Sequence, residues 1–138
     1  MTARTIAEQN FSIRAVSSAT VPSYLSAADA GISFIKPCIS KLASSPTKNG
    51  EYLAAGLPLI LNAGIGDSDA LVDEWNVGAM VRELNETDYV EAIEKIELLV
   101  KDPQVRTRTR VVADELFDLY SVGAERYAAL YERTLNNN

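Results

Sequence analysis

The sequence predicts an α/β protein built on a parallel sheet of about four strands, with flanking helices and a helical C-terminal region. Two observations support this. Up to residue 81, short apolar or alternating runs typical of strands take turns with helical patterns. That order favours parallel strands joined through helices. Beyond residue 81 the pattern is helical only, and the 138 residues suit a single domain with its own core.

The first half of the chain supplies two strands and two helices. A strand is expected over 11–16, where apolar and polar residues alternate. A short helix follows over 22–28, because Thr20-Val21-Pro22 is a typical helix start. Residues 30–35 are apolar almost throughout, as in a strand covered on both faces. A loop over 36–44 then leads to a helix over 45–56.

The next elements repeat this order with shorter segments. A third strand is expected over 57–62 and a glycine loop over 63–67. Asp67 or Ser68 caps the following helix, which runs to about Trp75. A short fourth strand covers 77–81. The carboxyl ends of parallel strands share one edge of a sheet, so the 36–45 and 63–67 loops should face the same crevice.

The C-terminal part, residues 86–135, is predicted to be helical. One helix carries an apolar stripe from Tyr89 to Val100, and Asp102-Pro103 restarts the helical pattern. Ser121 is expected to cap the last helix. Arg106, Arg108 and Arg110 form a local basic cluster, but alternate residues on a helix point to different sides. A solvated surface is the simplest interpretation of that cluster.

The amino-acid composition excludes several kinds of catalytic and metal site. The chain is 47% hydrophobic and 23% charged, as in ordinary globular proteins, and it has no apolar run long enough to span a bilayer. The single cysteine, Cys38, excludes an internal disulfide and fits a cytoplasmic location. The absence of histidine excludes Ser-His-Asp and Cys-His catalysis and histidine metal sites.

Charge is unevenly distributed along the chain. The net charge of −6 argues against nucleic acid as a partner. Residues 1–50 nevertheless carry a net charge of +3, and the remainder carries −9. The positive part leads into the helix over 45–56, which is compatible with an anionic ligand there.

The helix over 45–56 has the features of a phosphate-binding helix. Ser45 suits the N-cap, Pro46 suits the first helical position, and Gly56 suits the left-handed residue that ends a helix. Its first turn would present free backbone N–H groups and Lys48 to an anion. Glu51 shares the face of Lys48 and would accept hydrogen bonds from sugar hydroxyls.

A purely structural interpretation of this helix is also open. Ser-Pro starts are common, and a Lys/Glu pair at this spacing is often a weak surface ion pair. Gly50 slightly favours the interpretation that the helix binds a ligand. A glycine inside a helix costs about 1 kcal/mol relative to alanine, so its presence suggests a close approach by another group.

The motif around this helix resembles the donor-site motif of retaining GT-B glycosyltransferases of the group-1, or family 4, type. The resemblance covers roughly residues 11–135, with supporting flanks at 21–29, 62–67 and 77–78. It implies a Rossmann-like fold, as in the C-terminal domain of a GT-B enzyme. The matched motif residues are Ser44, Pro46, Lys48, Glu51, Tyr52, Ala54, Gly56 and Pro58.

The resemblance implies a nucleoside-diphosphate sugar donor and a set of residues that bind it. Glu51 would bind the ribose hydroxyls. The residues expected near the diphosphate are Ser44, Ser45, Thr47 and Lys48. Those bordering the sugar or phosphate are Gly64, Gly66 and Asp67, and those near the base are Val16, Ser17 and Ser18. No catalytic residue, metal site or cofactor beyond the donor is expected in the chain.

Two departures from the family pattern affect these expectations. Many relatives carry a second glutamate eight residues before the ribose-binding one, and here that position is Ala43. The resemblance also implies that 1–138 is one N-terminally incomplete nucleotide-sugar-binding domain, with the sheet portion at 11–81 and helices at 86–135. A missing N-terminal acceptor domain, supplied in cis or in trans, would be needed for transfer to a glycan or lipid-linked acceptor. Peripheral membrane association is possible for such a full-length enzyme.

Two other functions stay open. The chain is alternatively a non-catalytic interaction or regulatory module that retains the fold. A nicotinamide-dinucleotide domain fits poorly, because Gly64-Ile65-Gly66 is followed by Asp69 where the third glycine of that fingerprint should fall.

Overall fold

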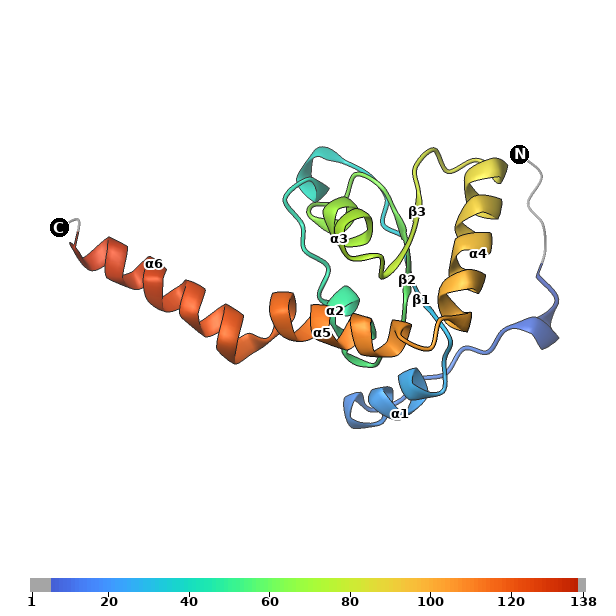
Figure 1. Ribbon diagram of the computed structural model, residues 1–138, viewed down its shortest axis with the longest axis horizontal. Coiled ribbons are helices and arrows are strands. Elements are labelled where there is room, and N and C mark those ends of the chain that lie inside the picture. The colour runs from blue at the N-terminus through green and yellow to red at the C-terminus, as the bar shows by residue number, and fades with distance from the viewer. Residues whose placement is uncertain (1–5, 137–138) are drawn as a thin grey trace.

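The computed structural model describes residues 6–136. Its centre is a parallel sheet of three strands in the order β1-β2-β3 (Figure 1). The strands are β1 (Gly31–Ser33), β2 (Leu59–Asn62) and β3 (Gly78–Val81). Residue Ile32 of β1 is in register with Ile60 of the central strand. The α/β class and the parallel sheet are therefore confirmed.

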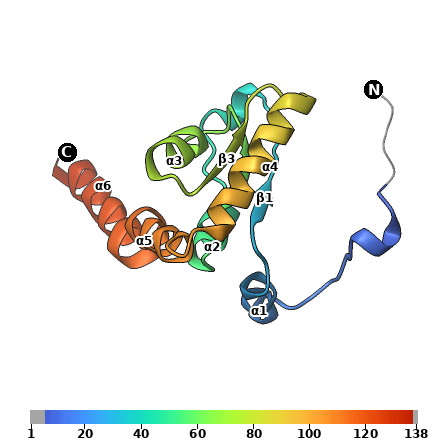
Figure 2. The same ribbon diagram turned by 45° about the vertical axis from the view of Figure 1, so that its right-hand side comes forward.

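Helices cover both faces of this sheet. α2 (Thr47–Ala54) and α3 (Ser68–Trp75) lie on one face, and α5 (Val105–Phe117) packs along α2 (Figure 1). α4 (Glu86–Lys101) packs against β3 on the other face (Figure 2). The core on the α2 side is formed by Leu53, Leu59, Leu61, Leu71, Val72, Val77, Val112 and Ala113. The core under α4 is formed by Ala79, Val81, Ala92, Ile96, Leu99 and Val105.

The helix–strand unit at the centre forms for the reasons that the sequence suggests. Gly56 has φ +85°, a left-handed conformation that glycine adopts without steric cost, and it ends α2 at the predicted place. Leu57, just before β2, and Leu59, its first residue, are then fully buried, because β2 is covered on both faces. The chain therefore passes from the exposed start of α2 directly into the centre of the sheet.

The strand predicted over 11–16 is wrong, and the sheet has three strands rather than about four. Every residue from Phe11 to Thr20 is exposed, and the segment runs away from the body of the protein (Figure 2). Alternation alone does not make a strand, which needs a neighbour to receive its backbone hydrogen bonds. Short turns η1 (Glu8–Asn10) and η2 (Ser18–Thr20) precede α1 (Val21–Ser26).

The C-terminal helices extend away from the sheet. After α5, the π-helical segment η4 (Leu119–Ala124) leads into α6 (Glu125–Asn136), which buries none of its residues (Figure 1). The predicted cap by Ser121 is wrong. The Asp118 carboxylate accepts hydrogen bonds from the backbone N–H groups of Tyr120 and Ser121, so it starts the helical segment three residues earlier.

No helix within residues 6–136 is both long enough and apolar enough to cross a membrane.

Candidate functional site

The start of α2 is open to solvent, but Ser45 does not cap it. Pro46 occupies the N-cap position, and no side chain accepts a hydrogen bond from the first turn. Within residues 6–136, the backbone N–H groups of Thr47 and Lys48 have no hydrogen-bond acceptor. The Ser45 hydroxyl donates instead to a carboxylate oxygen of Asp67, at 3.2 Å. The predicted N-cap is therefore wrong, because the helix starts one residue later than expected and Ser45 precedes the cap position.

The glycine loop lies directly against the loop that precedes α2. The backbone N–H of Gly66 donates to the Lys41 carbonyl at 2.9 Å, and Gly66 lies against the backbone of Ser44. Gly66 has φ +51° and Gly64 has φ +78°, so both occupy the left-handed region. The loops after β1 and β2 meet at one edge of the sheet, as the strand order predicts.

Asn62, at the end of β2, holds the preceding loop in place. Its side chain is buried; it accepts from the Ile35 N–H at 2.7 Å and donates to the Ile35 carbonyl at 2.9 Å. It therefore extends the connection between β1 and β2 beyond the last pair of strand residues. Sequence analysis missed this role, because the last polar residue of a strand gives no sign of its partner.

A second buried amide links the first turns of the two helices at this edge. Asn49 in α2 is buried, and its side-chain NH₂ donates to the Ser68 hydroxyl at the start of α3, at 3.5 Å. The Asn49 carbonyl oxygen has no partner within the described residues. The starts of α2 and α3 are thereby held side by side under the two loops.

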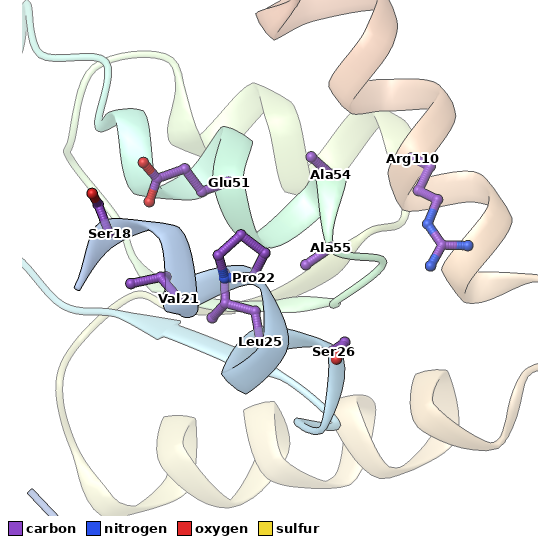
Figure 3. Close-up of a pocket in the computed structure, with 9 residues that line it drawn as sticks. All are labelled: Ser18, Val21, Pro22, Leu25, Ser26, Glu51, Ala54, Ala55 and Arg110. Atoms are coloured by element: carbon purple, nitrogen blue, oxygen red, sulfur yellow. The ribbon is translucent and has the colours of Figure 1, made fainter. Parts of the chain in front are cut away.

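Glu51 lies one turn into α2 and is exposed. It lines a pocket of about 520 Å³ between α1, α2 and α5, and Ser18 lines the same pocket (Figure 3). The apolar walls are Val21, Pro22, Leu25, Ala54 and Ala55, and the remaining polar residues are Ser26 and Arg110. Two predicted site residues, Ser18 and Glu51, are thus brought together from segments 33 positions apart. Val16 and Ser17 are exposed but do not line this pocket.

The close neighbour of Gly50 is a side chain of the protein itself. A Cβ on Gly50 would lie 2.9 Å from ring atoms of Phe117 in α5. The glycine therefore permits α2 and α5 to pack closely, and its presence carries no argument for a ligand. A second pocket, of about 360 Å³, lies beside this contact and is lined by Thr47, Glu51, Asp114 and Asp118 among others.

Lys48 is half-buried on the first turn of α2. Among residues 6–136 it forms no ion pair with Glu51, and it does not line the two pockets above or a third one. The third of these pockets, of about 290 Å³, adjoins Ser45 and Asp67 on the α3 side. The predicted residues Ser45, Thr47, Glu51 and Asp67 therefore surround the exposed start of α2, and Lys48 does not line these three pockets.

Comparison with known proteins adds no relative to this description. No family model matches the chain, and no curated protein or solved structure is significantly similar to it.

Proposed function

We propose that this chain binds a nucleoside-diphosphate sugar and forms the donor-binding part of a retaining glycosyltransferase. The observation that carries the proposal is the position of Glu51 relative to the open start of α2. A carboxylate one turn inside a helix whose first N–H groups are free suits a ligand with a phosphate next to a hydroxylated ring.

Each part of the donor has a matching group in this arrangement. The free N–H groups of Thr47 and Lys48 and the positive end of the helix dipole would bind the diphosphate. The Glu51 carboxylate would accept hydrogen bonds from the two ribose hydroxyls. Asp67 already accepts from Ser45 and is better suited to sugar hydroxyls than to a phosphate, because two anions repel each other. Transfer itself would require an acceptor-binding domain.

One observation favours the alternative, a non-catalytic module that retains the fold. Asp67 lies at the start of α2, and Glu51, Asp114 and Asp118 line the neighbouring pocket. These carboxylates make the surroundings of the helix start more negative, which disfavours a diphosphate. The two functions predict opposite results in a binding titration.

The test is to titrate the chain with a UDP-sugar and a GDP-sugar while recording backbone amide shifts. The proposal predicts shifts at 44–51 and at 64–67, and none around Ala92, a buried residue of α4 on the opposite face of the sheet. Glu51→Gln should weaken binding by about 1–3 kcal/mol, since a charge-assisted hydrogen bond is lost. Glu91→Gln, an exposed carboxylate on α4, is the matched control and should leave binding unchanged. No shifts at millimolar nucleotide sugar would favour the non-catalytic module.

A further inference from the structure

The pocket between α1, α2 and α5 has a different polar group at each end. Glu51 and Ser18 lie at one end, and Arg110 lies at the other, with the α1 residues between them (Figure 3). Val21, Pro22 and Leu25 supply apolar surface from α1, opposite Ala54 and Ala55 at the end of α2. The volume of about 520 Å³ is within the range of small-molecule pockets, which combine apolar walls with a few polar groups.

Arg110 is the uncommitted member of its basic cluster. Arg106 donates to the Ala28 carbonyl at 3.0 Å, and Arg108 forms an ion pair with Asp102 at 2.9 Å. Arg110 has no hydrogen bond or ion pair within residues 6–136, although it lies near Gly56 and lines the pocket. Its neighbours thus have structural partners, and its own donors are free to bind something else.

We propose that Arg110 is a specificity-determining residue that reads the base of the bound nucleotide. This inference rests on the function proposed above, which places the ribose at Glu51. With the ribose at Glu51, the flat base would occupy the apolar middle of the pocket. The far edge of the base then meets Arg110. A guanidinium only donates hydrogen bonds, so the edge that it selects must carry acceptors.

The chemistry selects a keto base. Uracil presents carbonyl oxygens, and guanine presents O6 and N7, to which arginine donates in a bidentate manner. Adenine places an NH₂ donor beside N7, so that edge would set a donor against the donors of Arg110. Ser26 lies on the same pocket; its hydroxyl donates to the Ser23 carbonyl, which leaves its oxygen to accept from a base N–H.

The experiment compares dissociation constants of UDP, GDP and ADP for the full chain and for Arg110→Met. The wild-type chain should bind UDP or GDP about tenfold more tightly than ADP, as expected for one good arginine–base contact. Arg110→Met should remove that preference and leave ADP binding nearly unchanged. Arg110→Lys should restore part of it, and the ratio of UDP to GDP affinity identifies the base. Arg133→Met, which makes the same charge change on the exposed helix α6, is the control and should leave the preference intact.

Three outcomes would overturn the inference, and they separate it from the proposed function. A wild-type chain that binds none of the three nucleotides refutes both. A preference for UDP or GDP that survives Arg110→Met refutes only the role of Arg110. An equal loss of UDP, GDP and ADP binding in Arg110→Met would mean that Arg110 acts on the phosphates or through general charge.

Discussion

Phe117 lies directly over Gly50, so that α5 can pack against α2 only because position 50 has no side chain. The two helices make the most extensive helix–helix contact in the described part of the chain. Because the neighbouring atoms include the Cβ and the first ring carbons of Phe117, they lie close to the backbone of α5. A new side chain at position 50 would therefore have to move α5 itself.

Gly50→Ala should destabilise the protein even though alanine favours helices. Overpacking at such a contact costs about 1–3 kcal/mol. The higher helix propensity of alanine relative to glycine offsets about 1 kcal/mol of this cost. We expect a net loss of stability, measured as a lower urea midpoint.

The double variant Gly50→Ala/Phe117→Leu is the control, because it removes the crowding. Its destabilisation should be smaller than the sum of the two single changes. A Gly50→Ala variant that is more stable than the parent would show that the contact is loose.

The two positive-φ glycines of the loop after β2 offer a matched pair of substitutions. A Cβ on Gly66 would overlap the carbonyl of Ser44, whereas nothing lies within 4 Å of a Cβ on Gly64. Either change to alanine should lower the stability by about 1–2 kcal/mol, because alanine is strained in the left-handed conformation. Gly66→Ala should in addition separate the two loops, which amide shifts at 41–45 would report. Equal stabilities and equal shifts for the two variants would contradict the contact.

The fold was predictable wherever the signal lies within a few residues. The residues before Gly56 favour a helix, and Gly56 ends it because glycine adopts φ +85° without steric cost. The apolar run from Leu57 is buried on both faces, as its composition indicates. By contrast, residues 11–16 have the alternation of a strand without a strand beside them, and no local pattern reports whether such a partner exists.

The parts of the site that sequence analysis missed depend on contacts between distant residues. The Ser45 hydroxyl donates to Asp67, 22 positions away, and no pattern near Ser45 indicates this partner. Pro46 rather than Ser45 takes the cap position of α2. Arg110 looked like one of several surface arginines, because its pocket is completed by α1, more than 80 residues earlier. The position of Glu51 one turn inside α2 was predictable, because its relation to the helix start is local.

The start of α4 should make stability depend on pH through Asp88. Its carboxylate accepts from the backbone N–H groups of Arg82 at 2.8 Å and Glu83 at 2.6 Å. Asn85 accepts in turn from the Asp88 N–H at 2.9 Å. The backbone hydrogen bond from Glu83 is the largest cause that lowers the pKa of Asp88 below its ordinary value of 3.8. The ionised form is therefore favoured in the folded protein.

A carboxyl group whose pKa is lower in the folded state stabilises the protein at pH values above its unfolded-state pKa. This stabilisation is lost as the pH falls through the folded-state pKa. Asp88→Asn should therefore reduce stability at pH 7, and the difference from the parent should shrink below about pH 4. Urea unfolding at a series of pH values measures this. Asp114→Asn, an exposed carboxylate with no hydrogen bond in the described part of the chain, is the control. A difference that persists unchanged to pH 2 would assign the effect of Asp88→Asn to something other than its charge.

The last helix should contribute almost nothing to the stability of the folded body. α6 buries no residue, and its main contact is with the adjoining segment η4. A 12-residue helix without packing is marginal in water, so its order is not a source of stability for the sheet. Deleting residues 125–138 should change the unfolding free energy by less than about 0.5 kcal/mol, the usual limit for surface changes. Ending the chain after Thr109, which removes the buried Val112 and Ala113, should abolish cooperative unfolding. A large loss from the shorter deletion would show that the apolar side of α6, with Tyr127, Tyr131 and Leu135, is packed in solution although exposed in this structure.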